Sequence, residues 1–233
     1  MKKFWVLLLT LTMALTACAA LGDSEGSVVQ SSVSIVQSGE YYLVYCFAQI
    51  HNNTDNIICL EKGSFDLQSG EQVLSTTDIQ ELWPYFLNPG EDGYVFDIVS
   101  FEPDENGNPV VPQVTGIAYQ IEYMTVDPSF ASYDLEAISE IITDASGDVS
   151  VRCRVTNNTD ADAFEPTVAM GLYTESGAMI YADGVTLRDV GIPAGGSVLL
   201  RFGVDEAFVS QWKGAGFMPA EARATASFRS DDD

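Results

Sequence analysis

Basic residues are scarce in this chain of 233 residues. Ten lysines and arginines stand against 34 aspartates and glutamates, which gives a formal net charge of −24 at pH 7. Lys2 and Lys3 are at the very start, so only 8 cations remain after them. A surface this acidic is repelled by nucleic-acid phosphates and anionic lipid head groups. The composition excludes a nucleic-acid-binding role, and solubility on a cell surface explains it most simply.

Histidine is scarcer still, because His51 is the only one. A single histidine beside a turn provides neither a zinc site nor a Ser-His-Asp set, and the chain has no CxxC pair or phosphate-binding glycine loop. "DENGN" (104–108) spaces its oxygen donors like a calcium loop, but Pro109 stands where such a loop needs glycine, so we expect a plain turn. The sequence therefore predicts no catalytic residue, no metal and no cofactor, hence a protein that is not an enzyme.

Cysteine is also rare, with four in all: Cys18, Cys46, Cys59 and Cys153. If Cys18 is modified, three cysteines remain. An odd number of cysteines cannot all pair within the chain, so this is not a disulfide scaffold. Cys46 and Cys59 lie on consecutive predicted strands. They could form a disulfide in an oxidising exterior or remain buried thiols.

Long apolar runs are confined to the N-terminus, where Phe4 to Leu15 follows Lys2 and Lys3. Twelve residues are too few to span a bilayer, which takes about 20, but they suit a signal peptide. "LTAC" (15–18) resembles the lipobox of bacterial lipoproteins. This resemblance implies a signal peptide over 1–17 and a diacylglyceryl group on Cys18. The protein would then be lipid-anchored on the extracytoplasmic face of a cell membrane, with residues 18–27 as a flexible tether.

The rest of the chain contains an internal repeat. "IHNNTDN" (50–56) returns as "VTNNTDA" (155–161), 105 positions later. Before each turn, apolar residues alternate with polar ones, as in a strand with one buried face; they are Val44, Cys46, Ala48, Ile50, Val149, Val151, Cys153 and Val155. Short strands and frequent turns over about 100 residues are typical of an immunoglobulin-like sandwich.

We therefore predict an all-β protein of two tandem immunoglobulin-like β-sandwiches, at residues 28–126 and 134–229. Residues 127–133 form the linker and 230–233 an acidic tail. In the later strands we expect Phe96 and Ile98 to face inward, as Leu200 and Phe202 do, and a short helix over 79–83.

The segments "FDLQS" (65–69) and "MGLYT" (170–174) are similar to the FxLYD type of immunoglobulin-like domain found in bacterial extracytoplasmic lipoproteins. The first copy lacks the Tyr, the second lacks the Phe, and neither has the Asp. The resemblance implies the sandwich fold and the location, but no activity.

Differences between the copies point to function, because shared features serve the fold. Outward positions of the second strand carry Tyr45 and Phe47 in the first copy but Arg152 and Arg154 in the second. Exposed aromatics anchor partners, so the candidate recognition surface is Tyr45, Phe47, Trp83, Tyr85 and Phe86. If exposed, it favours a binding module for a protein or cell-wall polymer. If buried between the domains, it favours an accessory subunit of an envelope complex, such as a transporter or cell-wall machine.

Overall fold

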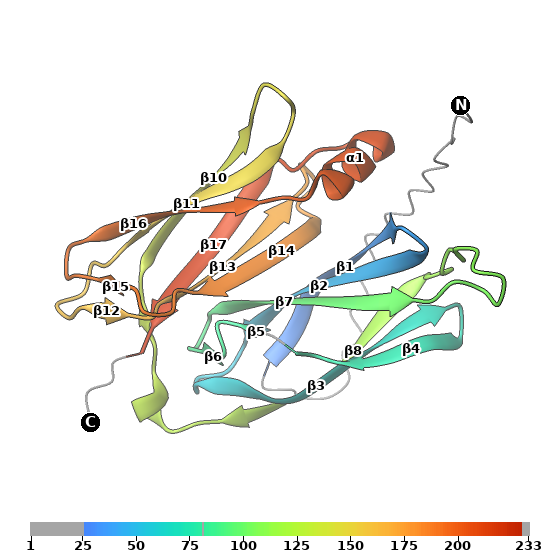
Figure 1. The fold of residues 1–233 in the computed structure, drawn as a ribbon. Coiled ribbons are helices and arrows are strands. Elements are labelled where there is room, and N and C mark those ends of the chain that lie inside the picture. The colour runs from blue at the N-terminus through green and yellow to red at the C-terminus, as the bar shows by residue number, and fades with distance from the viewer. Residues whose placement is uncertain (1–25, 81, 230–233) are drawn as a thin grey trace.

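The computed structural model describes residues 26–80 and 82–229. The predicted signal peptide, Cys18, most of the predicted tether and the predicted acidic tail lie outside the described residues. Within the described part, no helix is long and apolar enough to cross a membrane. The fold is all-β, as predicted, with two sandwiches and one α-helix (Figure 1).

Domain one packs two sheets face to face. The first has the order β1–β2–β7–β5; its strands are β1 (Gly26–Ser38), β2 (Tyr41–Asn52), β7 (Asp92–Phe101) and β5 (Leu82–Trp83). In the second, β3 pairs with the other three strands; they are β3 (Ile58–Ser69), β4 (Gln72–Asp78), β6 (Phe86–Leu87) and β8 (Gly116–Thr125). The alternating apolar residues predicted on β2 are fully buried between these sheets, which confirms the inward face.

Domain two follows a 3-10 turn, η1 (Pro128–Phe130), and is built in the same way. One sheet has the order β10–β11–β16 and the other β14–β13–β17–β9. Their strands are β10 (Glu136–Thr143), β11 (Val149–Thr156), β16 (Ser197–Gly203), β14 (Met179–Thr186), β13 (Thr167–Tyr173), β17 (Glu221–Phe228) and β9 (Tyr133–Asp134). A small pair, β12 (Ala163–Phe164) with β15 (Gly191–Ile192), completes the domain.

The strand register shows how closely the copies match. Ile50 lies opposite Gly93 in domain one, and Val155 lies opposite Val198 in domain two. Val155 and Val198 each lie 105 positions after Ile50 and Gly93, which is the spacing of the sequence repeat. The repeat is therefore structural as well as sequential.

Two sequence predictions about individual elements are wrong. In β7 the side chains buried in the domain core are Val95 and Val99, whereas Ile98 is 46% exposed and Phe96 packs against domain two. The spacing of 105 pairs Val95, not Phe96, with Leu200, so the predicted alignment was one residue out of phase. The expected helix over 79–83 is absent, because β4 runs to Asp78 and β5 begins at Leu82.

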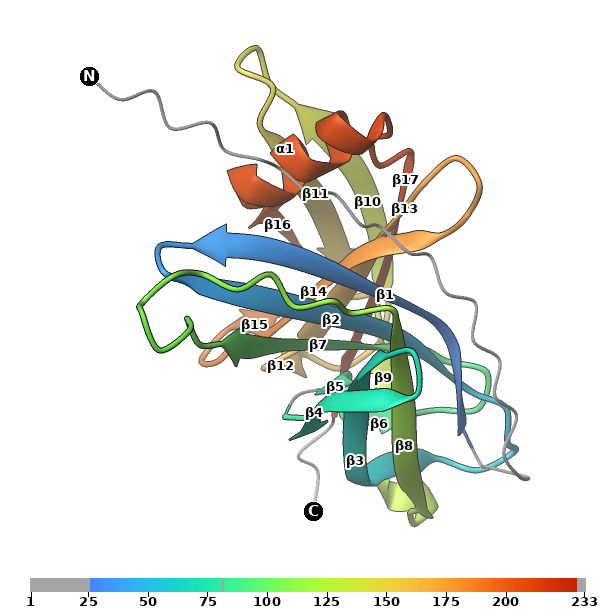
Figure 2. The same ribbon diagram turned by 90° about the vertical axis from the view of Figure 1, so that its right-hand side faces the viewer.

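Residues 26–80 and 82–229 contain one α-helix, α1 (Glu206–Ala215), which was not predicted. The Asp205 side chain accepts a hydrogen bond from the Ala207 amide at 2.7 Å, and Gly216 ends the helix with φ of 80°. Helix α1 buries Phe208, Val209 and Trp212. It lies beside β1, as Figure 2 shows.

The cysteines of the two domains are buried free thiols. Cys46, Cys59 and Cys153 form no disulfide, so of the two alternatives for Cys46 and Cys59 the structure has unbridged thiols. Burial raises the pKa of Cys153 to about 11 and also raises those of Cys46 and Cys59. Thiols protonated at neutral pH are poor nucleophiles, and none of the three has the surroundings of a reactive cysteine.

Candidate functional site at the seam between the domains

The repeated Asn-rich turn serves the fold in both copies. The buried Asn52 amide donates to the carbonyl oxygens of Asn56 and Leu87, at 2.8 and 2.9 Å, and accepts from the amide and hydroxyl of Thr54. Asn157 makes the same four bonds with the residues 105 positions later. An amide enclosed in this way is not presented as a glycan acceptor, although the NNT pattern occurs in both turns.

His51 is half-buried at the end of β2. Its Nδ1 lies 2.8 Å from Oδ1 of Asp92 on the neighbouring strand. Residues 26–80 and 82–229 contain no group of three metal-ligating side chains. The polar partner of His51 is the Asp92 carboxylate.

The aromatic face of β2 is covered by domain two. Phe47 has no exposed surface, and its ring centroid lies 5.2 Å from that of Tyr181. Tyr45 meets Phe208 of α1 edge to face at 4.7 Å. The outer face of β1–β2–β7 packs on the outer face of β13–β14, so four sheets are stacked (Figure 1). Phe47 is consequently unavailable to an outside partner and Tyr45 is partly buried in the same contact, so assigning them to a recognition surface is corrected.

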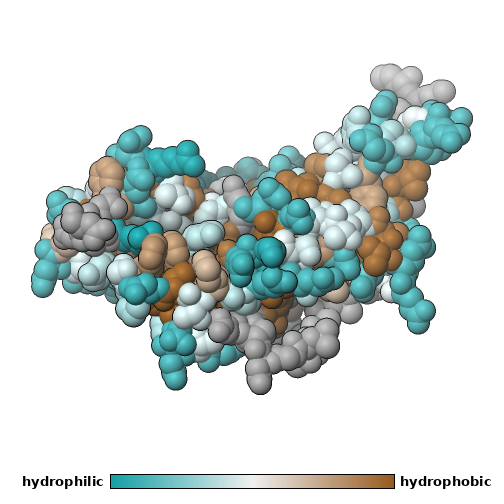
Figure 3. Space-filling model, turned by 90° about the horizontal axis from the view of Figure 1, so that it is seen from below, coloured by the Kyte–Doolittle hydropathy of each residue, from teal (hydrophilic) through white to brown (hydrophobic). Residues whose placement is uncertain are grey.

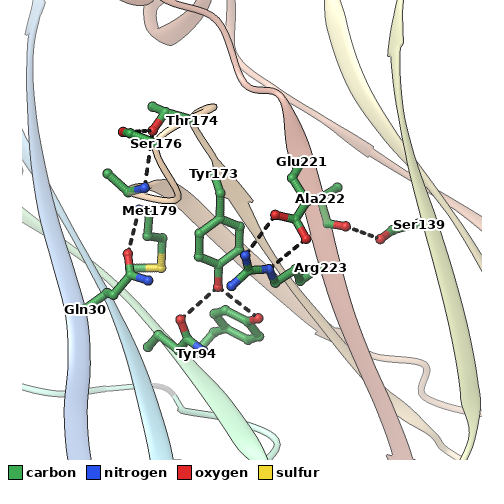
Figure 4. A network of polar contacts seen from close by, with 12 residues as sticks. Gln30, Tyr94, Ser139, Tyr173, Thr174, Ser176, Met179, Glu221, Ala222 and Arg223 are labelled. Atoms are coloured by element: carbon green, nitrogen blue, oxygen red, sulfur yellow. Dashed lines mark hydrogen bonds and ion pairs between the residues drawn. The ribbon is translucent and has the colours of Figure 1, made fainter.

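A buried polar network fixes the two domains at this interface (Figure 4). The Tyr173 hydroxyl donates to Oε1 of Gln49 at 2.9 Å and lies 3.2 Å from the Tyr94 hydroxyl. The Arg223 guanidinium stacks over the Tyr173 ring at 4.1 Å and is held by Glu221. The contacts among Tyr173, Gln49 and Tyr94 satisfy polar groups that are buried at the interface. The Arg223–Glu221 pair lies at its edge, about half-exposed.

Two glycines of domain two allow this close approach. A Cβ on Gly171 would lie 2.7 Å from the Tyr94 ring, and one on Gly184 would lie 2.5 Å from the Trp83 ring. Trp83 is thus part of the interface, and it too must be removed from the predicted recognition surface.

Tyr85 and Phe86, the remaining two residues of that surface, line a cavity of about 410 Å³ at the seam. We call it the seam groove. Its walls come from both domains and the linker; they are Pro84, Tyr85, Phe86, Ser132, Phe164, Glu165, Thr167, Ser227, Phe228 and Arg229. Tyr85 is 54% exposed and Phe164 is 51% exposed. The molecule seen from below carries several hydrophobic patches among hydrophilic side chains (Figure 3).

The seam groove contains one cation and one backbone constraint. The Arg229 guanidinium stacks on Phe86 at 4.9 Å and on Phe130 at 4.7 Å, which holds it flat against the aromatic wall. Glu165 has φ of 46°, a left-handed conformation that non-glycine residues rarely adopt. Its Oε1 accepts the Asp189 amide at 3.1 Å. The groove offers ring faces, one cation and one carboxylate, which suits binding.

Only part of this groove has a signal in the sequence. Phe164 stands at the position of Cys59, and this difference between copies marks an aromatic on one domain alone. Arg229 and Phe130 had no such signal, because they reach the groove through the way the domains dock.

Comparisons with known proteins identify no family. No family model matches the chain, and no curated protein matches it. Among solved structures it is similar to red sea bream transglutaminase, with 10% identity and a TM-score of 0.24. The match covers 88% of this chain and 30% of the transglutaminase chain.

Proposed function

We propose that this protein is a lipid-anchored, extracytoplasmic binding module without catalytic activity, and that the seam groove holds its ligand. The supporting observation is that half-exposed aromatic side chains from two domains, Tyr85 and Phe164, line one cavity. Exposed aromatics are costly in water and are frequent binding anchors. The cavity volume also lies within the range of about 300–1,000 Å³ found for ligand sites.

Site-specific photocrosslinking in intact cells tests this proposal. The photoreactive amino acid benzoylphenylalanine is placed at Tyr85 or Phe164, and at Tyr41 as a control. Tyr41 is 41% exposed at the start of β2, and it does not line the seam groove. We expect ultraviolet-dependent adducts from positions 85 and 164 and none from 41. Adducts of equal yield from all three, or from none, would refute the groove as the binding site.

An accessory subunit of an envelope complex is the second candidate. It is favoured by the burial of Tyr45 and Phe47, which joins the two domains into one body. The same experiment separates the candidates: one adduct with a single protein supports the accessory role, whereas a ladder of polymer adducts supports polymer binding. The variant Cys18→Ala tests the anchor, because it should leave the membrane fraction.

A further inference from the structure

The contact between the domains joins two different sheet faces. Domain one contributes the outer face of β1–β2–β7, and domain two contributes the outer face of β13–β14. Since each domain is a copy of the other, each has both kinds of face and uses only one. The unused faces lie on opposite sides of the four-sheet stack (Figure 1): β10–β11–β16 on domain two, and β3–β4–β8 on domain one. We call them the open domain-two face and the open domain-one face.

The open domain-two face carries a small net positive charge, although the protein is strongly acidic, because three arginines stand against two exposed glutamates, Glu136 and Glu140. Three of the eight cations that follow Lys3 lie on it: Arg152, Arg154 and Arg201. Arg152 pairs with Glu140 at 2.9 Å, and Nε of Arg201 donates to Ser150.

Arg154 makes no hydrogen bond or ion pair with any residue of 26–80 or 82–229. It lies between two apolar cross-strand neighbours, Ile138 and Leu199, which are 58% and 56% exposed. An exposed cation between exposed apolar side chains is typical of a surface that binds a partner.

The open domain-one face is acidic. Outward positions of its strands carry Asp66, Asp78 and Glu122. Lys62 lies 3.7 Å from Glu122, and both are exposed. Asp66 accepts the Thr76 hydroxyl at 2.6 Å. The two open faces thus have opposite charge.

The repeat places these charges at the positions that make the contact inside the molecule. Phe47 and Phe96, which pack on domain two, correspond to Arg152 and Arg201 at the spacing of 105. On the other side of the contact, Gly171 corresponds to Asp66 in the same way.

Gly184 corresponds to Asp78 through its strand partner. It lies opposite Ala169, whose counterpart Ser64 lies opposite Asp78. At the inner contact, aromatic side chains of domain one pack on glycines of domain two. At the equivalent positions, the open domain-two face has arginines and the open domain-one face has aspartates.

We propose that the open domain-two face of one molecule docks on the open domain-one face of a second copy, as domain one docks on domain two within the chain. The contact is heterologous, so it continues from copy to copy as a row. Both copies are acidic, but at physiological salt the repulsion is screened beyond about 8 Å, while paired side chains lie closer than that.

Sedimentation of the full chain in detergent at physiological salt tests the proposal. We expect wild-type protein to form dimers and longer species as its concentration rises. The variants Arg152→Glu/Arg154→Glu and Asp78→Lys/Glu122→Lys should each stay monomeric, with affinity reduced by about tenfold or more. Lys213→Glu and Asp160→Lys make the same kinds of charge reversal at exposed positions off both faces, and they should associate like wild type.

Mixing the two double variants is the decisive measurement. Each keeps one intact face, so an equimolar mixture should form heterodimers although neither variant associates alone. Equal melting temperatures would show that both are folded. Wild-type protein that stays monomeric at every concentration would overturn the proposal, as would double variants that associate as wild type does or a mixture that stays monomeric.

Discussion

At the scale of single residues, the clearest case is the asparagine that anchors each repeated turn. Asn157 has no exposed surface, and its side chain joins its own turn to β15: it donates to Ala161 at 2.7 Å and Ile192 at 2.8 Å and accepts from Thr159. No other side chain of similar size provides both donors and the acceptor. The same set of bonds accounts for an asparagine at this place in both copies.

The first prediction follows from these bonds. Asn157→Ala should lower the free energy of unfolding by about 2–3 kcal/mol, because the buried Ile192 carbonyl oxygen loses its donor and the bond to the Ala161 carbonyl oxygen is lost as well. Urea denaturation measures the loss. Asn158→Ala is the matched control, since that neighbour is exposed and only reaches Glu136 at 3.3 Å. Equal losses in both variants would contradict the structural role.

The second prediction concerns Glu91 in the turn before β7. Burial raises the pKa of this carboxyl to about 7, despite the hydrogen bond that Oε2 accepts from the Asn88 amide, and nearby Asp134 and Asp92 raise it further. The folded chain therefore binds a proton that the unfolded chain releases near pH 4.5. The stability contributed by this group is complete below that pH and is lost as the pH rises towards about 7.

Glu91→Gln should remove that loss, because the amide needs no proton and its oxygen can still accept from Asn88. The difference in unfolding free energy between variant and wild type should grow between about pH 5 and about pH 8. Chemical denaturation at several pH values measures it. Glu105→Gln, in the exposed turn 104–108, is the control. A difference that does not change with pH would refute the buried carboxyl.

At the scale of elements, the stacked sheets depend on glycines that lack a side chain at the contact. Domain two places Gly184 on β14 against the Trp83 ring of domain one. Alanine normally stabilises a strand relative to glycine, so the sign of the effect distinguishes a close contact from ordinary strand geometry.

The third prediction is that Gly184→Ala lowers stability by about 1–3 kcal/mol, because the new methyl group must push the sheets apart. Scanning calorimetry measures the change in melting temperature. Gly203→Ala is the matched control on β16, where an added Cβ would meet nothing within 4 Å. If Gly184→Ala is as stable as this control, the sheets are not as close as described.

At the scale of the whole molecule, the sequence predicts each sandwich better than it predicts their assembly. The buried residues of β2 and β11 follow from alternation along the strand, which depends only on neighbouring residues. Phase was lost in β7, because Tyr94, Phe96 and Ile98 are as apolar as the core-facing Val95. At Tyr94 and Phe96 both faces of that strand are covered, one by its own domain and one by the other, so alternation disappears there.

The seam groove was only partly predictable for a related reason. Tyr85 and Phe86 could be selected as aromatics on a turn. Arg229, which lies beside them in the groove, is 143 positions after Phe86 in the sequence. That proximity depends on the packing of Tyr94 on Gly171, a contact between copies that no local pattern describes. The sequence signal for this docking of the domains was Gly171 in the second copy, where the first copy has Asp66.

The pairing of β1 has a mechanical consequence. From Gly26 to Ser38 this edge strand is bonded along its length to β2, and its first residue is the point where the N-terminal segment enters the fold. Ladder bonds run perpendicular to the strands. A pull on the N-terminal segment along the strand axis therefore loads all these bonds together in shear, instead of opening them one by one. If the chain is tethered through this segment, the fold is oriented to withstand tension from its own attachment.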